Sequence, residues 1–151
     1  MSCQTPMHWQ RDNFTVSCDP EKIDLAVVSG FLASSYWAKG ITEQTVAKSL
    51  ANSLCFALLD GDRQVGFARV VSDNATIAYL MDVFVLPDYR GRGLAKWLLQ
   101  CVFSHSELQG LRRWVLGTRD AHGLYRQFGF SGLAKPEVFM ELHDPDAYGG
   151  A

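Results

Sequence analysis

Arg90-Gly91-Arg92-Gly93-Leu94-Ala95 opens an amphipathic helix directly after an apolar strand pattern that runs from Val83 to Pro87. Backbone N–H groups at a helix N-terminus have no intrahelical partner and carry a partial positive charge. Glycines at such a point let an anion approach the main chain closely, and the two arginines add side-chain charge. This strand-to-helix turn is therefore predicted to bind a phosphate group.

Two common phosphate-binding motifs do not fit the turn. A mononucleotide P-loop closes on Gly-Lys followed by Ser or Thr, and the chain has no such ending here. A dinucleotide-binding fingerprint needs a third glycine at the position that Lys96 occupies. What remains is the pattern Arg/Gln-x-x-Gly-x-Gly/Ala, which Arg90, Gly93 and Ala95 match.

This pattern resembles the acetyl-CoA site of the GNAT superfamily of N-acyltransferases. In that family a later strand leads into a short helix that carries a tyrosine and ends in a Gly-Phe step. The chain has the strand-like run from Trp114 to Thr118, then Tyr125 and Gly129-Phe130 in the same order and spacing. The resemblance covers roughly residues 60 to 142, and the preceding segment in outline.

The resemblance implies an acetyl-CoA ligand. Its pyrophosphate is expected on the N–H groups of residues 91–95, near the two arginines. In this family the central strand splays from its neighbour, so its backbone is free to pair with the pantetheine arm and to polarise the thioester carbonyl. The residues expected to bind the cofactor are Val83, Phe84, Val85, Arg90, Gly91, Arg92, Gly93, Leu94 and Ala95.

Tyr125 and Asp82 are the candidate catalytic residues. Tyr125 matches the family tyrosine that protonates the departing thiolate, and a phenol with a pKa of ~10 stays protonated at neutral pH. Asp82 interrupts an apolar strand face just before the pantetheine-binding segment, where burial would raise its pKa toward that of a useful base. Two other roles stay open for Asp82: an anchor for the acceptor ammonium while water takes the proton, or a structural carboxylate.

The acceptor side is expected in an aromatic loop. By analogy with the family, Tyr36 and Trp37 cover the acceptor channel, where their ring faces could hold a cationic amine; ordinary packing is the alternative. Arg69 and Arg119 are candidates for an acceptor carboxylate, with solvated surface arginines as the alternative.

Composition narrows the class of protein. A chain of 151 residues with 48% hydrophobic and 20% charged residues suits one domain, residues 1–151, with frayed ends at 1–8 and 144–151. The formal charge of −2 gives no bulk attraction to nucleic acid or anionic membrane.

No leader or membrane-spanning pattern is visible, so a cytoplasmic location is expected. Cys3, Cys18, Cys55 and Cys101 lack metal-ligand spacing, so free thiols and no metal are expected.

The apolar periodicities predict an α/β (α+β) fold, and with the resemblance they indicate a GNAT-like mixed, mostly antiparallel central sheet flanked by helices, with a splayed central strand. The strand at 76–86 is expected to be central because both of its faces are mostly apolar. Expected strands are 14–17, 54–59, 64–71, 76–86, 112–118, 130–131 and 138–142; expected helices are 19–35, 42–52, one from residue 93 and one around Tyr125.

The resemblance thus implies an N-acetyltransferase that moves an acetyl group from acetyl-CoA to a primary amine of a small molecule. Direct attack in a ternary complex is expected, because no cysteine is placed beside a histidine to form an acetyl-enzyme. The alternatives are a non-catalytic acyl-CoA-binding sensor and an acyltransferase for a protein or peptide amine. Small domains with exposed sheet edges often pair, so a homodimer is also considered.

Overall fold

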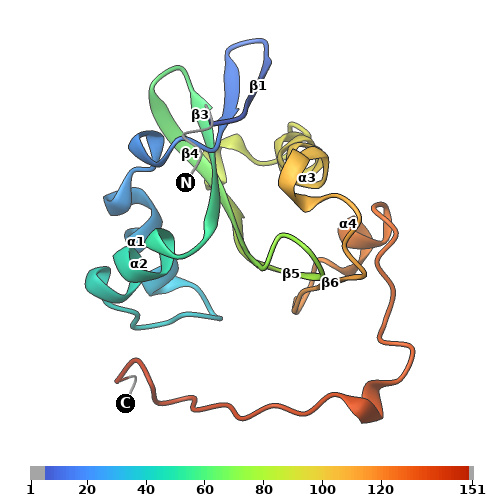
Figure 1. Ribbon diagram of the computed structural model, residues 1–151. Helices are drawn as coiled ribbons and strands as arrows, with labels where there is room; N and C mark the ends of the chain where they lie inside the picture. Colours follow the sequence, from blue (N-terminus) through green and yellow to red (C-terminus); the bar gives the residue numbers. More distant parts are fainter. Residues whose placement is uncertain (1–5, 150–151) are drawn as a thin grey trace.

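The computed structural model describes residues 6–149 (Figure 1). Its strands are β1 (His8–Arg11), β2 (Phe14–Ser17), β3 (Leu54–Asp60), β4 (Arg63–Ser72), β5 (Ile77–Val85) and β6 (Arg113–Val115). Its α-helices are α1 (Leu25–Ser34), α2 (Glu43–Ala51), α3 (Leu94–Ser104) and α4 (His122–Arg126), and short 3₁₀ turns cover Pro20–Lys22, Pro87–Tyr89, Ser106–Leu108 and Pro136–Val138.

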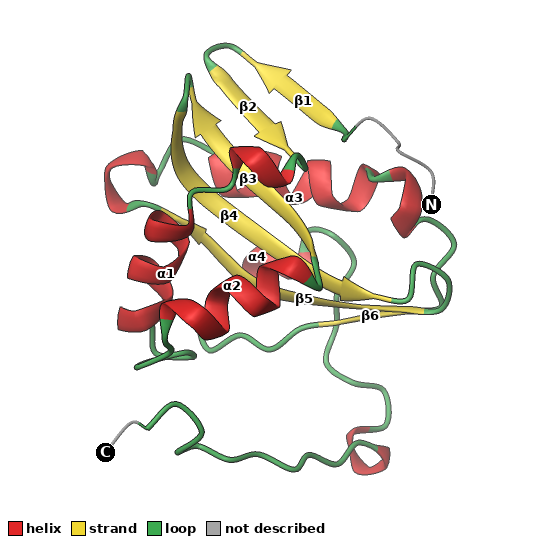
Figure 2. Cartoon of the chain, turned by 60° about the vertical axis from the view of Figure 1, so that its left-hand side comes forward, coloured by secondary structure: helices red, strands yellow, loops and turns green. Residues whose placement is uncertain are grey.

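The six strands form one sheet in the order β1-β2-β3-β4-β5-β6. Every neighbouring pair is antiparallel except β5 and β6, which are parallel and are joined through α3. The expected mixed, mostly antiparallel sheet is confirmed. Figure 2 shows α1 and α2 on one face of the sheet, with α3 and α4 on the other.

Two hydrophobic clusters hold the helices to the two faces. On one face Leu98 and Val102 of α3 pack with Phe56 of β3, and all three side chains are fully buried. On the other face Val28 of α1 and Val46 of α2 pack over Phe67 and its neighbours. Fully burying one such side chain stabilises the fold by about 1.5–3 kcal/mol. Successive side chains of β3 and β4 point to opposite faces of the sheet, so both faces bury apolar groups and the sheet is held between the two helix layers.

The segment expected as one helix from 19 to 35 is two elements. Asp19 caps the 3₁₀ turn, Ile23 is extended, and the Asp24 carboxylate accepts from the Val27 N–H at 3.2 Å to cap α1. The backbone N–H of Asp24 in turn donates to the buried Gln64 side chain at 2.6 Å. Because Gln64 of β4 accepts from the Asp24 N–H, the chain is fixed at this point, and Asp24 caps a new helix.

The second helix agrees with its sequence signals. Thr42 accepts from the Thr45 N–H at 3.2 Å and caps α2. Ile41 before the cap and Val46 after it are both buried in one cluster, as a hydrophobic staple requires. Among the later elements, α3 begins after Gly93 and Gly129 takes the left-handed conformation after α4, as expected.

β5 differs from the strand expected at 76–86. It lies fifth of six rather than at the centre, and Ile77 and Tyr79 are exposed, so only one face of its first half is buried. β6 pairs with β5 only from Ile77 to Tyr79, because β6 is much shorter than the expected 112–118. The second half of β5 is therefore splayed from β6, as the resemblance implied.

The final strand pair expected at 130–131 and 138–142 is absent from the described residues. After α4 the chain turns away from the sheet and crosses below it toward α1 and α2 (Figure 1). Pro136 starts a 3₁₀ turn in place of a strand, because proline fixes its own φ and lacks a backbone N–H donor. At the other end, His8 already belongs to β1, so the fraying expected for residues 1–8 does not include it.

Candidate active site

A break in the pairing of β4 and β5 lies at the centre of the site. The register shifts between Phe67 and Arg69, where Phe67 faces Phe84 but Arg69 faces Met81. Asp82 sits at this bulge with a φ of 55°, a left-handed conformation that aspartate tolerates better than most side chains. The bulge turns the Asp82 side chain out of the strand alternation and toward Arg69 and Trp37.

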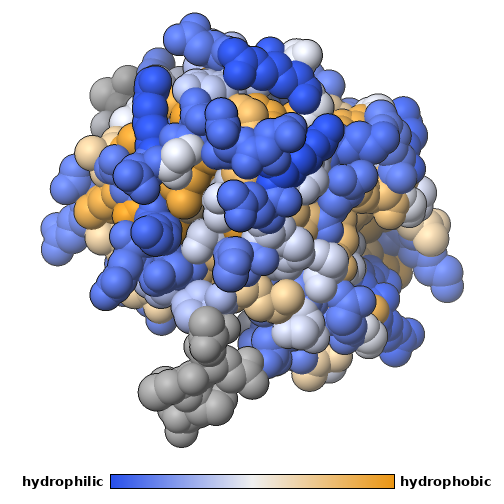
Figure 3. All heavy atoms as spheres, turned by 90° about the horizontal axis from the view of Figure 1, so that it is seen from above, coloured by the Kyte–Doolittle hydropathy of each residue, from blue (hydrophilic) through white to orange (hydrophobic). Residues whose placement is uncertain are grey.

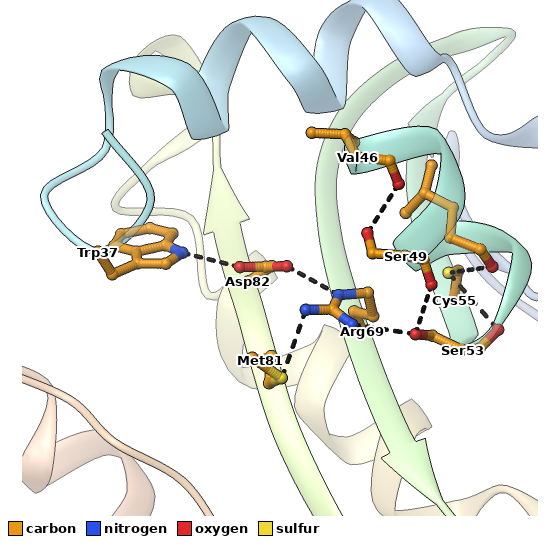
Figure 4. A network of polar contacts seen from close by, with 9 residues as sticks. Trp37, Val46, Ser49, Ser53, Cys55, Arg69, Met81 and Asp82 are labelled. Carbon is orange, nitrogen blue, oxygen red and sulfur yellow. Dashed lines mark hydrogen bonds and ion pairs between the residues drawn. The ribbon is translucent and has the colours of Figure 1, made fainter. Parts of the chain in front are cut away.

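A polar network surrounds Asp82 (Figure 4). Arg69 Nε donates to Asp82 Oδ2 at 2.8 Å in an ion pair whose side chains are 11% and 7% exposed. Trp37 Nε1 donates to Asp82 Oδ1, also at 2.8 Å. Arg69 Nη1 donates to Ser53 Oγ at 3.0 Å, and Nη2 lies 3.3 Å from Met81 Sδ. The network joins the α1–α2 loop, the residue before β3, and strands β4 and β5.

This network bears on two expectations from the sequence. Arg69, considered there for an acceptor carboxylate, holds Asp82 of its own chain instead. Asp82 accepts one hydrogen bond on each carboxylate oxygen, which is the arrangement of the structural carboxylate considered from the sequence. Asp82 thus holds the side chains of Arg69 and Trp37 in place. Its role as a base stays a prediction.

Tyr36 and Arg119 join two loops at the opening of the site. The backbone N–H of Arg119 donates to Tyr36 Oη at 3.1 Å, and the guanidinium carbon lies 3.9 Å from the centre of the Tyr36 ring. Trp37 packs edge-on against Tyr36, with ring centroids 5.0 Å apart. Tyr36 and Trp37 remain 47% and 40% exposed, so part of each ring surface is open to solvent.

Tyr125 projects from α4 into the same region. Its side chain is buried, and burial, followed by the nearby Tyr36 phenol, raises the pKa of Tyr125 from 10.0 to about 12. Its ring packs edge-on against Phe130 at 5.9 Å. Tyr36 of the α1–α2 loop is the second cause of this rise in the pKa of Tyr125, although the two tyrosines are far apart in the sequence.

The turn before α3 forms an open cradle of backbone N–H groups. Gly91 and Gly93 have φ values of 79° and 74°, so a side chain would be strained there although the space around each is open. Among the described residues, the N–H groups of 91–95 make no hydrogen bond. Arg90 Nε donates to the Val85 carbonyl at 2.9 Å, and the Arg92 guanidinium lies 5.0 Å over the Tyr89 ring.

The described cysteines are unsuited to covalent catalysis. Cys18, Cys55 and Cys101 are free and buried, and burial raises the pKa of each thiol from 9.0 to about 12. Since the thiolate is the nucleophile, a thiol this weakly acidic does not attack at neutral pH. The expectation of free thiols is confirmed for these three, and Cys3 lies outside the described residues.

Sequence reasoning missed several contributors to the site. Ser53 carries no motif, and only the fold brings it to Arg69. Phe31 and Phe84 stack at 4.0 Å with an angle of 9° between their planes, which ties α1 to the second half of β5. The sequence indicated an aromatic loop at Tyr36 and Trp37, but it did not indicate that Phe31 of the preceding helix packs on β5.

Two kinds of feature are absent from the described part of the chain. No helix between residues 6 and 149 combines the length and the apolar character needed to span a bilayer. Within the same range, no group of three or more His, Cys, Asp or Glu side chains is placed to hold a metal ion.

Comparison with known proteins identifies the family. The family model for the acetyltransferase (GNAT) domain matches residues 51–132. The acetyltransferase-family protein FG08082 of Gibberella zeae is 30% identical over 143 residues, covering 80% of both chains. This chain belongs to the GNAT acetyltransferase family.

Solved structures agree with that assignment. A crystal structure from Xanthomonas campestris pv. campestris, assigned to the same family, is 46% identical with a TM-score of 0.87 and covers 89% of this chain and 96% of its own. A family member from Elizabethkingia anophelis, crystallised with acetyl-CoA bound, is 14% identical with a TM-score of 0.62 and covers 89% of this chain and 91% of its own. The second likeness supports the fold alone.

The Asp82→Asn variant tests the polar network. Asparagine tolerates the left-handed conformation but removes the charge, leaving the mostly buried Arg69 guanidinium without its counter-ion. We expect a loss of about 1–3 kcal/mol in the free energy of unfolding, measured by urea denaturation. Asp88→Asn, at an exposed site in the turn before α3, is the matched control and should change stability by less than about 0.5 kcal/mol. Equal stability of the two variants would contradict a supporting role for the ion pair.

A spectrophotometric titration tests the environment of Tyr125. The difference in tyrosinate absorbance between the native protein and its Tyr125→Phe variant should titrate with a midpoint near pH 12 rather than 10, because burial disfavours the charged phenolate. Since the folded pKa lies above that of the unfolded chain, this tyrosine supports the fold below pH 10, and its contribution is lost as the pH rises toward 12. A midpoint near 10 would mean that the hydroxyl is solvated.

Proposed function

We propose that this GNAT family member transfers an acetyl group from acetyl-CoA to a primary amine of a small-molecule acceptor, by direct attack in a ternary complex. The observation that carries the proposal is the combination of three features: the free N–H groups of 91–95, the second half of β5, which pairs with β4 but not with β6, and the buried Tyr125 of α4. The crystal structures from Elizabethkingia anophelis and Clostridium acetobutylicum, whose chains share this fold, were obtained with acetyl-CoA.

The described residues fit a coenzyme A ligand. The N–H groups from Gly91 to Ala95 have hydrogen-bonding capacity to offer a diphosphate, and the dipole of α3 adds favourable charge. β5 lacks a β6 partner beyond Tyr79, so the backbone of Val83 to Val85 can pair with an amide-bearing arm as an added strand would. When bound, acetyl-CoA supplies an acetyl group activated as a thioester.

The proposed role of Tyr125 is to direct its protonated hydroxyl at the sulfur of acetyl-CoA, on which negative charge develops as the thiolate departs. Because the pKa of Tyr125 is raised to about 12, the hydroxyl keeps its proton at neutral and mildly alkaline pH. So weak an acid acts by donating a hydrogen bond as the charge builds up, which favours the transition state over the ground state. The low exposure of Tyr125 excludes water and strengthens that hydrogen bond.

The acceptor is proposed to bind at the loop of Tyr36 and Trp37. Their exposed ring faces attract a cationic amine, and the Arg119 guanidinium stacked on Tyr36 is placed for a negatively charged group of the acceptor. Asp82 fixes the Trp37 indole by its hydrogen bond and acts as a positioning residue. In this scheme water takes the proton that the ammonium loses before attack.

An assay for the release of free coenzyme A thiol, run with a panel of amines, distinguishes two other functions from the proposed one. A non-catalytic acyl-CoA sensor would bind the cofactor but release no free thiol with any amine. An acyltransferase for protein or peptide amines would release thiol with peptides and not with small amines. The aromatic rings and the Arg119 guanidinium lie close together at the Tyr36 loop, a spacing that suits the separate charged groups of a small-molecule acceptor.

Replacing Gly93 by alanine tests the cradle. A φ of 74° is unfavourable for alanine by about 1–2 kcal/mol, so the turn should shift and its N–H groups should diverge. We expect coenzyme A affinity, measured by calorimetry, to fall by roughly tenfold. Gly30→Ala, in the body of α1 with open space around it, is the control and should bind as the native protein does. Unchanged affinity in Gly93→Ala would argue against the cradle.

Replacing Tyr125 by phenylalanine tests the hydrogen bond that its hydroxyl is proposed to donate to the departing sulfur. The ring and its packing on Phe130 remain, but the hydroxyl is lost, so kcat for thiol release should fall by about a hundredfold or more. Acetyl-CoA affinity should stay within a factor of about two, because the cradle is untouched. A loss of affinity with kcat unchanged would assign Tyr125 to binding rather than to chemistry.

A further inference from the structure

Large apolar side chains are exposed at one end of the sheet. Val71 of β4 is 42% exposed, and Ile77 and Tyr79 of β5 are 42% and 45% exposed. Among the strand residues that the structure describes, no other large apolar side chain is exposed to this extent. The end of the sheet at the top of Figure 1, seen from above in Figure 3, is instead covered mostly by hydrophilic side chains. Single exposed apolar residues are common, but a continuous exposed patch marks a binding surface.

The exposed side chains form one continuous surface. Val71 lies directly opposite Tyr79 in the antiparallel pairing of β4 and β5, and Tyr79 lies directly opposite Val115 in the parallel pairing of β5 and β6. Side chains directly opposite one another on adjacent strands share a face of the sheet and are about 5 Å apart. Ile77 shares the same face, because it lies two residues from Tyr79. Together Val71, Ile77, Tyr79 and Val115 form the open sheet face.

The open sheet face points to the side of α1 and α2, but these helices do not cover it. Leu80, which alternates with Tyr79 along β5, belongs to the cluster that packs on α3, so Tyr79 points to the other side. The cluster that packs on α1 and α2 contains Phe67 and Phe84, but none of the four residues of the open sheet face. This part of the sheet is therefore left to contact a ligand.

The open sheet face continues into the polar network of the site. Met81 follows Tyr79 on the same face of β5 and lies directly opposite Arg69, and its sulfur is 3.3 Å from Arg69 Nη2 (Figure 4). Asp82 comes next, and the segment proposed to bind the pantetheine arm begins at Val83. Because the cofactor is proposed to lie beyond Asp82 in the direction of the cradle, the body of an acceptor whose amine reaches Asp82 lies over Tyr79 and its neighbours.

The charges on this part of the sheet disfavour a second cationic group in the acceptor. Asp82 is the one acidic residue in β4, β5 and β6, and both of its carboxylate oxygens already accept hydrogen bonds. Asp73, between β4 and β5, accepts from backbone N–H groups of its own turn. Arg113, directly opposite Ile77, adds a positive charge at the edge of the open sheet face. An ammonium group placed there would lose hydration without gaining a free carboxylate from these strands or their turn.

We propose, on the basis of the N-acetyltransferase function proposed above, that the acceptor is a primary amine with an uncharged, apolar body, alkyl or aryl, and that this body lies on the open sheet face. Tyr79 lies three positions before Asp82, which corresponds to about 10 Å at the rise of an extended strand. A hexyl chain or a phenethyl group covers that distance. In the reaction the amine nitrogen bonds to the acetyl carbon as the carbon–sulfur bond breaks, the nitrogen loses one proton to water, and the departing thiolate gains one from water.

Two pairs of amines test the preference for an apolar body. Hexylamine and cadaverine have the same length, but the methyl end of the first is an ammonium group in the second. The amino acids α-aminoheptanoate and lysine differ in the same way and add a carboxylate for Arg119. With acetyl-CoA, kcat/KM for thiol release should be higher for the apolar member of each pair by roughly tenfold or more, because the ammonium is desolvated without a partner. Equal values, or higher values for the diamines, would overturn the proposal.

The Val71→Asp variant tests whether the open sheet face makes this selection. A carboxylate at this exposed position gives the second ammonium of cadaverine a partner, so the hexylamine-to-cadaverine ratio of kcat/KM should fall by about tenfold or more. Gln10→Asp adds the same charge at an exposed position of β1, at the other edge of the sheet, and should keep the native ratio. Both variants should keep the native circular dichroism spectrum. The same ratio in the two variants would overturn the proposal.

Binding without transfer separates this proposal from the proposed function. Coenzyme A, which carries no acetyl group, is added to native protein with ¹³C-labelled valine and isoleucine methyl groups, and hexylamine or cadaverine is then titrated. Hexylamine should shift the methyl signals of Val71, Ile77 and Val115 more than cadaverine does, and should leave those of the buried Val16 of β2 unchanged. These shifts without thiol release from any amine would refute the proposed transfer and leave the apolar amine site supported. Thiol release with hexylamine but no shift on the open sheet face would overturn the proposal.

Discussion

The ion pair between Arg69 and Asp82 is the contact on which the arrangement of the site depends. It forms only because the bulge between β4 and β5 rotates Asp82 out of the regular strand alternation, and the positive φ of Asp82 is the local consequence. Removing either partner would leave a charge in a mostly buried setting, which is costly, so the pair and the bulge stabilise each other. Trp37 is then fixed by the remaining carboxylate oxygen, which sets the position of the aromatic loop.

The bulge and the short β6 together produce an opening in the sheet. Past the bulge, β5 continues toward α3 without a neighbour on its β6 side, and the cradle of backbone N–H groups begins directly after it. A long ligand with amide groups and a phosphate end needs a free strand edge and a group of free N–H donors. In this chain the two follow one another in the sequence. Tyr125 and Tyr36 approach from separate elements at the other side of that opening, where low exposure favours the protonated phenol.

The sequence by itself determined the strand-to-helix cradle, the Tyr125 helix, the capped α2 and the hairpin of β3 and β4, because each depends on residues close together in the chain. Glycine at a left-handed turn, a threonine cap, and an apolar run followed by an Asp-Gly-Asp turn express local physics that a single sequence displays directly. The tertiary structure decided the partners of Asp82: a bulge changes the register of two strands, and neither Arg69 nor Trp37 is near Asp82 in the chain. It also decided that residues 138–142 form no strand within their own sheet, because strand formation needs a neighbouring edge as well as a suitable pattern.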